Sequence, residues 1–256
     1  MPTFDTWFPY RRPAAGFELF AFPHIAAGPT LFHPLRAALA PIGVTLTAAL
    51  PPGRGKRLRE PPHRSMSDLV AEFADLARVD GYAAFQGEYG LVGHCSGALV
   101  AYEVAKVLTA APCRNPALLI ACSCLPPRLI RDTGTSRLPV DEMFARTTAL
   151  GGTADALLAD PGFRQAVAAP MRADWEIFDG YADRSPGVLP VPVLAVRGAH
   201  DASVPADGLQ GWQDHSRYPL RTAEVDADHW VLTPQGSAVL AREISTALSV
   251  PTGAAR

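Results

Sequence analysis

Short hydrophobic runs alternate with longer amphipathic segments over most of this chain. Runs typical of buried strands occur at Glu18–Phe22, 44–50, 191–198 and 220–225. Two further runs of this kind end at Gly93 and begin at Ala117. Helical patterns follow these runs. One ends near Ala40, one covers 66–77 with Ser65 as its N-cap, one begins after Gly97, and two cover 206–215 and 235–248. This alternation favours a mainly parallel sheet covered by helices on both faces, so the pattern predicts the α/β fold class.

The alternation breaks between about Pro126 and Val188. Helical segments are expected there over 141–150, 154–159 and 163–181, and no convincing strand separates them. In a sheet protein such a stretch is expected to be an insertion. We therefore expect a core formed by residues 1–125 and 189–250, a helical lid inserted at 126–188, and a frayed tail at 251–256.

Composition and charge limit the class of protein. A chain of 256 residues, 48% of them hydrophobic, can bury one large core. The formal net charge of -2, without a long run of one sign, argues against nucleic-acid binding and against a polybasic membrane anchor. No apolar stretch reaches the roughly eighteen residues of a spanning helix, and the start MPTFDTWFPYRR lacks the pattern of a signal peptide. We expect a cytoplasmic monomer whose partner is a small molecule or a protein.

The stretch GLVGHCSGA, residues 90–98, marks the point where an expected strand meets an expected helix. A strand, a sharp turn and a helix in direct succession are typical of a nucleophile elbow, in which the residue at the turn carries the reactive side chain. That residue is Cys95, where serine is usual. Gly93 and Gly97 provide the small neighbours that a strained turn requires. From these residues alone, an ordinary glycine-rich turn stays the alternative.

A cysteine nucleophile needs a group that favours its thiolate, and a histidine oriented by a carboxylate is the usual arrangement. In α/β hydrolases the acid and the histidine follow the nucleophile in that order, each after a late strand. Asp201 follows the expected strand at 191–198, and His229 follows the one at 220–225, so order and placement both fit. Asp226 and Asp228 are weaker candidates for the acid because they share the loop of His229.

The other histidines are less suited to catalysis. His94 adjoins Cys95 and His200 adjoins Asp201, so we expect each to point away from the site and to have a structural role. Four more lie in expected loops or helix starts, where we interpret them as polar surface residues: His24, His33, His63 and His215.

An acyl-transfer site also needs hydrogen-bond donors for the oxyanion, and backbone amides are sufficient. The N–H of Ser96 directly follows the nucleophile. The small-residue loop after the first expected strand should lie beside the elbow, so the N–H of Ile25 or Ala26 can be the second donor. An ordinary tight turn between strand and helix is an equally good interpretation of this loop.

Five separated motifs, in the same order, resemble the type II thioesterases that serve polyketide and non-ribosomal peptide synthetases. The motifs are FELFAFPHIAAGPTLFHPL, LPPGRGKRLREPP, GLVGHCSGALVAYEVA, LGGT with MRADWEIFDGY, and RGAHDASV with DADHWVL. The resemblance implies an α/β-hydrolase fold with a mobile helical lid over an acyl channel. It also implies that Cys95 is the nucleophile, Asp201 the acid and His229 the base, with Ile25 where a small residue usually contributes the oxyanion amide.

The chain departs from the family pattern at two points. The loop reads HIAAG where a small residue followed by two glycines is common, which leaves the oxyanion donor open. Cys95 replaces the usual serine, so transfer from a pantetheine thiol would exchange one thioester for another and keep the acyl group activated. A small group of related proteins with cysteine at the elbow shuttles aminoacyl groups between carrier domains.

Three functions follow as hypotheses. The resemblance favours a thioesterase that releases acyl or aminoacyl groups from the phosphopantetheine arm of an acyl or peptidyl carrier protein. The alternative is an acyltransferase that passes the group from Cys95 to a second carrier thiol or to an amine. A non-catalytic scaffold that only binds carrier proteins is the third, and the complete set of Cys95, Asp201 and His229 argues against it.

Residues that contact substrate are less well defined by the sequence. Trp175, Phe178 and Tyr181 are spaced by three and could line an acyl channel, although packing explains such a stripe equally well. Three arginines of an expected loop could bind the phosphate of the pantetheine arm, or they could be solvated cations. They are Arg54, Arg57 and Arg59. Four cysteines in a chain this long indicate no disulfide framework, and their spacing indicates no zinc site, so we expect no metal or tightly bound organic cofactor.

Overall fold

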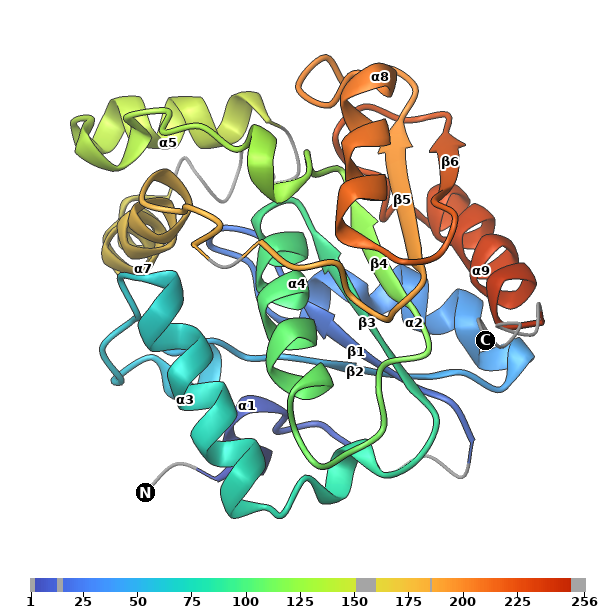
Figure 1. Ribbon diagram of the computed structural model, residues 1–256. Helices are drawn as coiled ribbons and strands as arrows, with labels where there is room; N and C mark the ends of the chain where they lie inside the picture. Colours follow the sequence, from blue (N-terminus) through green and yellow to red (C-terminus); the bar gives the residue numbers. More distant parts are fainter. Residues whose placement is uncertain (1–2, 13–15, 151–159, 185, 250–256) are drawn as a thin grey trace.

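In a computed structural model, which describes residues 3–12, 16–150, 160–184 and 186–249, the chain forms a six-stranded parallel sheet (Figure 1). The strand order is β2-β1-β3-β4-β5-β6. The strands are β1 (Glu18–Phe22), β2 (Thr45–Ala48), β3 (Tyr89–His94), β4 (Leu119–Cys122), β5 (Val193–Gly198) and β6 (Arg221–Val225). Every neighbouring pair is parallel, so the carboxyl ends of all six strands lie at one edge of the sheet.

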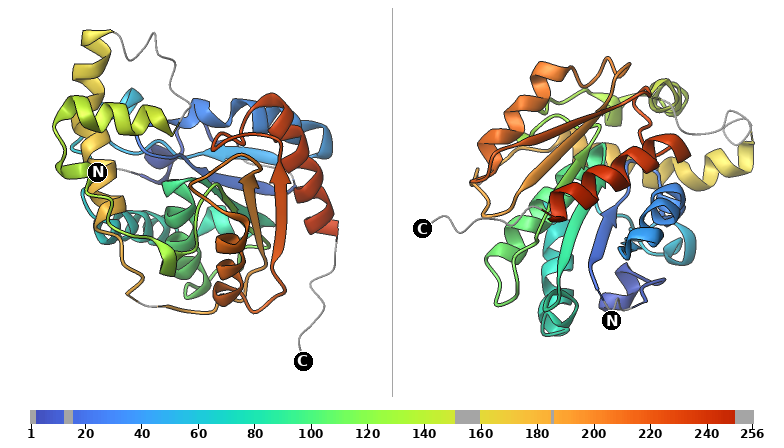
Figure 2. Two further views of the ribbon diagram at one scale, coloured as in Figure 1. Left: turned by 90° about the horizontal axis from the view of Figure 1, so that it is seen from above. Right: turned by 90° about the vertical axis from the view of Figure 1, so that its right-hand side faces the viewer.

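Helices cover both faces of the sheet (Figure 2). They are α1 (Phe4–Trp7), α2 (His33–Leu39), α3 (Met66–Val79), α4 (Ser96–Thr109), α5 (Val140–Ala149), α7 (Pro161–Asp179), α8 (Ala206–Leu209) and α9 (Pro234–Ser249). One hydrophobic core joins α3 and α4 to one face, and a second joins α2 and α9 to the other. The parallel sheet with helices on both faces confirms the fold class predicted from the hydrophobic pattern.

Most predicted elements differ from the observed ones by one or two residues at their ends, as β5 and α7 do, and three differences are described here. The strand expected over 44–50 is shorter, at Thr45–Ala48. The helix expected over 206–215 is α8 followed by a 3-10 turn, Gln210–His215. Helix α1 has only four residues and no periodic pattern to predict it, yet its Phe4 and Trp7 are buried.

Helices α5 and α7 lie between β4 and β5 in the chain, where the alternation of strands and helices breaks. Asp160 caps α7 by accepting the N–H of Phe163. The two helices pack on each other and on the loop after β1 through one apolar cluster: Ile25, Met143, Phe144, Met171 and Trp175. The helix expected over 154–159 lies outside the described residues. These helices therefore cover the carboxyl edge of the sheet, next to the end of β1.

Candidate active site

Cys95 occupies the tip of a sharp turn between β3 and α4. Its backbone φ of 51° lies in the left-handed region, which a residue with a Cβ adopts only under strain. A Cβ at Gly93 would lie 2.1 Å from the carbonyl oxygen of Gly97, and a Cβ at Gly97 would lie 2.1 Å from that of Phe22. The turn can therefore form only because both flanking residues are glycines, as the elbow hypothesis required.

Asp201 and His229 come together from the loops after β5 and β6. The Nδ1 of His229 lies 2.8 Å from Oδ2 of Asp201. The other oxygen of Asp201 accepts the backbone N–H of Ser203 at 2.9 Å and its hydroxyl at 2.5 Å. Because each carboxylate oxygen is held by a different partner, the side chain of Asp201 is fixed in the orientation that faces His229.

The free edge of the His229 ring faces Cys95. His229 and Cys95 line the same small cavity, of about 20 Å³, and Nε2 of His229 has no hydrogen-bond partner among the described residues. Burial lowers the pKa of His229, but the hydrogen bond with Asp201 and the interaction with Cys95 outweigh it and raise the pKa to about 10. His229 therefore holds a proton at neutral pH, in a position to stabilise a thiolate at Cys95.

The two alternative acids, Asp226 and Asp228, and likewise Asp207, have other partners. Asp226 is exposed and forms an ion pair with His200 at 2.9 Å. Asp228 accepts the backbone N–H of Trp230. Asp207 is exposed and bonds to the N–H of Gly208 at the start of α8. The geometry thus brings His229 together with Asp201 and leaves the other three carboxylates turned away from it.

Histidines behind the elbow form an aromatic cluster instead of a second catalytic set. His94 is fully buried, stacks on Trp230, and its Nε2 bonds to the backbone oxygen of His229 at 3.0 Å. Burial holds the pKa of His94 well below its usual value and lowers that of His24 to about 3. His94 therefore supports the loop of His229 as a neutral side chain, which is the structural role expected for it.

The interpretation of four histidines as polar surface residues was wrong for two of them. His24 packs edge-on against Trp230 and bonds to the backbone oxygen of Ile25. His215 is 1% exposed and lies 3.1 Å from the hydroxyl of Tyr102. Position outside the long helices and strands predicts exposure poorly here, because neighbouring elements cover both side chains.

The candidate oxyanion amides are near the elbow, but two of them already have partners. The N–H of Ile25 donates to the hydroxyl of Ser96 at 3.1 Å. The N–H of Ala26 donates to Asp174 of α7 at 2.7 Å, and Ala26 has a φ of 61°. The N–H of Ser96, at the start of α4, has no hydrogen-bond partner among the described residues. In this conformation the Ser96 amide is the available donor next to Cys95.

Two of the three loop arginines are bound to acidic side chains of the protein. Arg54 forms two hydrogen bonds with Asp174, at 2.9 and 2.8 Å. Arg57 is buried and bonds to Leu50, Glu60 and Glu72. Only Arg59 is an exposed cation without such a partner among the described residues.

The three aromatic residues of α7 have different surroundings. Trp175 lines the cavity of Cys95, and its Nε1 donates to the hydroxyl of Thr147. Phe178 lines a neighbouring apolar pocket of about 40 Å³ together with Ile25 and Ser96. Tyr181 packs into the core and donates to Glu103. Trp175 and Phe178 are thus the members of the stripe that face the site.

Ser203, Asp174 and Trp230 are neighbours of the site that sequence reasoning missed. Ser203 follows Asp201 by two residues, a spacing at which an aspartate commonly bonds to the backbone ahead of it. That local signal could have been found. Asp174 reaches the site through tertiary packing, so no local pattern marks it, whereas Trp230 directly follows His229 and lies at the site with it.

Comparison with known proteins decides the family. A family model described as "Thioesterase domain" matches residues 17–248. The chain belongs to the thioesterase domain family. Thioesterase PikA5 of Streptomyces venezuelae is 27% identical over 242 residues, which cover 94% of this chain and 84% of that protein.

Solved structures of family members share the fold. RedJ, with polyethylene glycol in its active site, is 26% identical with a TM-score of 0.82 and coverage of 92% of this chain and 94% of RedJ. The type II thioesterase BorB from the borrelidin biosynthetic cluster is 25% identical, with a TM-score of 0.83. The match covers 97% of this chain and 99% of BorB. The resemblance to type II thioesterases is confirmed, and the architecture is the α/β-hydrolase fold.

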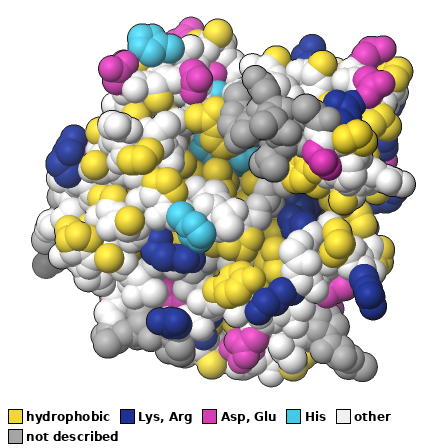
Figure 3. Space-filling view, turned by 180° about the vertical axis from the view of Figure 1, so that it is seen from behind, with side chains coloured by type: hydrophobic (Ala, Val, Ile, Leu, Met, Phe, Trp, Pro, Cys, Tyr) yellow, Lys and Arg dark blue, Asp and Glu magenta, His cyan; other side chains and the backbone are white. Residues whose placement is uncertain are grey.

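Hydrophobic and histidine side chains line a hollow on the face opposite to that of Figure 1, and several Lys and Arg side chains lie on the same face (Figure 3).

In the part of the chain that is described, no group of three or more His, Cys, Asp or Glu residues could hold a metal ion. No helix of the described ranges has the length and apolar character to cross a membrane.

Proposed function

We propose that this thioesterase releases acyl or aminoacyl groups from the phosphopantetheine arm of carrier proteins in polyketide or non-ribosomal peptide biosynthesis. One observation carries the proposal: Cys95, on a strained elbow, shares a small cavity with His229, which Asp201 orients at 2.8 Å. Membership of the thioesterase domain family and the similarity to BorB support the same substrate class.

In the first half-reaction the thiolate of Cys95 attacks the carbonyl carbon of the thioester. The N–H of Ser96 donates to the resulting oxyanion, and the N–H of Ile25 joins it when Ile25 turns from the Ser96 hydroxyl. Collapse of the intermediate breaks the bond to the pantetheine sulfur, which leaves with the proton of His229. The products are an acyl thioester on Cys95 and a free pantetheine thiol.

Acylation also prepares the second half-reaction. The thiolate charge, which contributes to the raised pKa of His229, disappears when Cys95 becomes a thioester. Neutral His229 then takes a proton from water, and the hydroxide attacks the acyl carbon. The acid is released, Cys95 leaves as a thiolate, and His229 is again protonated beside it, so that the cycle is closed without a cofactor.

Residues 126–188 act as the lid in this proposal. Trp175 of α7, together with Leu150 at the end of α5, lines the cavity of Cys95. Movement of these helices away from the loop of Ile25 would enlarge this cavity for a longer acyl group. Opening and closing of the lid then controls both entry of the arm and access of water.

Acyl transfer to a second thiol or an amine is the second candidate, and the identity of the nucleophile favours it. A thioester on Cys95 keeps the activation of the incoming thioester. The cavity around it is largely apolar, with Ile25, Leu150, Trp175 and Trp230 among its lining residues. An activated acyl group in largely apolar surroundings is suited to attack by a better nucleophile than water.

Intact-protein mass spectrometry tests these proposals. The protein is mixed with an acyl-loaded carrier, and then with water alone, with a second holo carrier, or with an amine. We expect an acyl adduct on the wild type and none on Cys95→Ala. Faster discharge to the second carrier or the amine than to water would establish transfer. Tight carrier binding without any adduct would contradict both proposals and favour a scaffold.

A further inference from the structure

The first turn of α4 lies directly against the end of β1 and the loop that follows it. A Cβ at Gly97 would lie 2.1 Å from the carbonyl oxygen of Phe22. This close approach brings the side chain of Ser96, which directly follows Cys95, to the backbone N–H of Ile25. The position of the Ser96 hydroxyl is therefore set by the same packing that forms the elbow.

The hydroxyl of Ser96 accepts one hydrogen bond and has a proton left to donate. Its oxygen accepts the N–H of Ile25 at 3.1 Å. A hydroxyl can accept and donate at the same time, and among the described residues no acceptor lies within hydrogen-bond distance of its proton. The backbone N–H of Ser96 also lacks a partner in that part of the chain. Ser96 therefore offers two donors next to Cys95, one from its backbone and one from its side chain.

Hydrogen bonds hold the loop of Ile25 on both sides of that residue. In the peptide before it, the carbonyl oxygen of His24 accepts the N–H of Ala27 at 3.0 Å, and the N–H of Ile25 is bonded to Ser96. In the peptide after it, the carbonyl oxygen of Ile25 lies 2.7 Å from Nδ1 of His24, and the N–H of Ala26 is bonded to a carboxylate of α7. A turn of the Ile25 N–H toward an oxyanion would break both bonds of its own peptide, so the loop is arranged to stay in place.

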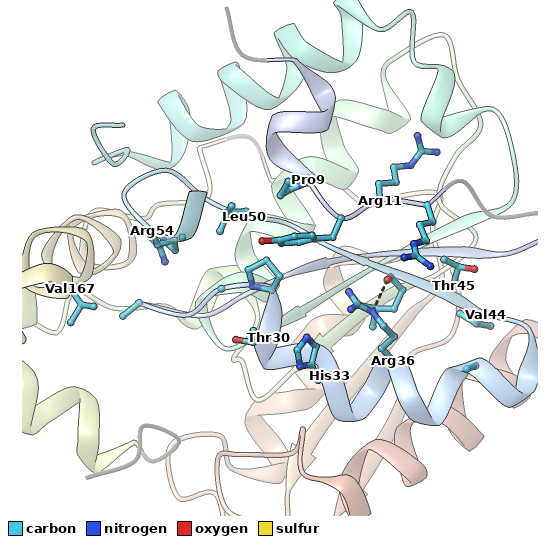
Figure 4. Close-up of a pocket in the computed structure, with 18 of the residues that line it drawn as sticks. Pro9, Arg11, Thr30, His33, Arg36, Val44, Thr45, Leu50, Arg54 and Val167 are labelled. Atoms are coloured by element: carbon cyan, nitrogen blue, oxygen red, sulfur yellow. Dashed lines mark hydrogen bonds between the residues drawn. The ribbon is translucent and has the colours of Figure 1, made fainter. Parts of the chain in front are cut away.

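Apart from the candidate base, the other donor side chains around Cys95 and Ser96 are engaged or closed off within the described ranges. Arg54 lines the pocket of Ser96 and one end of a large groove along β2, of about 1220 Å³ (Figure 4). Its guanidinium bonds to a carboxylate of α7 and to two backbone oxygens. The hydroxyl of Thr147, in the cavity of Cys95, donates to a backbone oxygen of α5. Nε1 of Trp230 has no partner, but it is buried and does not reach the cavity surface.

We propose that Ser96 is a further catalytic residue, whose hydroxyl donates the second hydrogen bond to the oxyanion formed at Cys95. As the sulfur–carbon bond forms, the π electrons of the carbonyl move to its oxygen, which accepts from the N–H and the O–H of Ser96, and the hydroxyl keeps its proton. The N–H of Ile25 stays on the hydroxyl oxygen and makes it a stronger donor. The N-terminus of the 14-residue helix α4 favours the same negative charge. The proposal rests on the proposed function and gives this hydroxyl the place assigned there to the N–H of Ile25.

Replacement of Ser96 tests whether its hydroxyl is a donor. With S-acetyl-pantetheine as the probe, mass spectrometry of single turnovers gives the rate constant for acylation of Cys95 at saturation. We expect Ser96→Ala to lower this rate constant about tenfold or more and to leave the half-saturating concentration unchanged, because the hydroxyl meets charge that develops only in the transition state. Ser96→Thr keeps a hydroxyl at this position and should restore most of the rate.

Ser67→Ala is the matched control. Ser67 is an exposed serine in the first turn of α3, and its hydroxyl bonds to that of Ser65. This variant should keep the wild-type rate constant. An equal loss in Ser67→Ala and Ser96→Ala would overturn the proposal.

Infrared spectroscopy gives a readout that does not depend on rate. When Cys95 carries a carbon-13-labelled acetyl group, the carbonyl stretch should lie at a lower frequency in the wild type and Ser96→Thr than in Ser96→Ala, because a donor to the oxygen weakens the C=O bond. Equal frequencies in all three proteins would overturn the proposal, as would an unchanged acylation rate constant in Ser96→Ala. A higher rate constant in Ser96→Ala would also overturn it, and would show that the hydroxyl blocks the N–H of Ile25.

The same measurements separate this proposal from the proposed function. In each of the contrary outcomes Cys95 still forms its acyl adduct, so the proposed function stands. Failure of every thioester, acyl-loaded carriers included, to acylate wild-type Cys95 would instead overturn the proposed function.

Discussion

Asp174 of α7 accepts the backbone N–H of Ala26 at 2.7 Å, across 148 residues of sequence. The same carboxylate binds Arg54 through both of its oxygens. Ala26 has a left-handed backbone conformation, which costs energy for a residue with a Cβ. Asp174 therefore joins α7, the arginine-rich loop and the loop that carries the candidate oxyanion amides.

Replacing Asp174 should destabilise the protein because Arg54 and the Ala26 N–H would both lose a partly buried charged partner. We expect Asp174→Ala to lower the free energy of unfolding by about 2 kcal/mol, and Asp174→Asn by less, since an amide oxygen can still accept from Ala26. Urea unfolding measures the change. The control is Asp75→Ala, whose exposed ion pair with Arg78 should contribute little. An equal effect of the two alanine variants would contradict this role for Asp174.

The raised pKa of His229 depends on Cys95 as well as Asp201. Its value of about 10 results from attraction to both groups against the cost of burial. In Cys95→Ala, and likewise in Asp201→Asn, we expect the pKa of His229 to be lower than in the wild type. Titration of the imidazole C–H signals by NMR measures each value. An unchanged pKa in Cys95→Ala would show that His229 does not interact with the thiolate.

The same pKa gives stability a defined pH dependence. The pKa of His229 is raised from 6.5 to about 10, so the folded protein keeps a proton that the unfolded chain releases between these pH values. Stabilisation from this group is complete below pH 6.5 and is lost as the pH rises toward 10. Relative to His229→Gln, the wild type should therefore lose stability over this window in urea titrations. A constant difference between the two proteins would refute the assignment.

The elbow should not tolerate any side chain at its flanking glycines. In Gly97→Ala the new Cβ would lie 2.1 Å from the carbonyl oxygen of Phe22, which is backbone and cannot move aside alone. We expect a large loss of stability and no acylation of Cys95. Gly87→Ala is the control, because a Cβ there has open space around it. Thermal unfolding and acyl-adduct formation report the two effects, and a stable, active Gly97→Ala protein would show that the turn has another geometry.

The strands and most helices could be predicted because their burial follows a simple period. β1 is buried at all five positions, as expected for a strand covered on both faces, and Ser65 caps α3 by accepting the N–H of Asp68. The helix expected over 206–215 ends early, after α8, because of tertiary contacts. A Cβ at Gly208 or Gly211 would meet Leu125 or Pro126, so the chain there is shaped by the loop after β4.

The site could be predicted where chemistry and chain order specify it, and not where distant packing does. Cys95, Asp201 and His229 were found from the elbow and from loops after late strands, and the geometry brings the latter two to 2.8 Å. The hydrogen bond from Ala26 to Asp174 joins loops far apart in the sequence, which no local pattern encodes. The contact of Arg36 with the backbone oxygen of Leu46 follows from the order of strands, which places β2 at an edge.

Sulfur at the elbow should decide the fate of the captured acyl group. In Cys95→Ser the acyl-enzyme would be an oxygen ester, which transfers less readily to a thiol. We expect the variant to form its adduct more slowly, because a serine hydroxyl has no thiolate charge beside His229, and to show a much lower ratio of thiol transfer to hydrolysis. Mass spectrometry of the adduct in the presence of a holo carrier measures this ratio. Cys113→Ser is the control for the exchange itself and should keep the wild-type ratio. Cys113 lies in the segment after α4, where its Sγ donates to the backbone oxygen of Leu108. If Cys95→Ser also keeps that ratio, the sulfur does not determine whether water or a second thiol receives the acyl group.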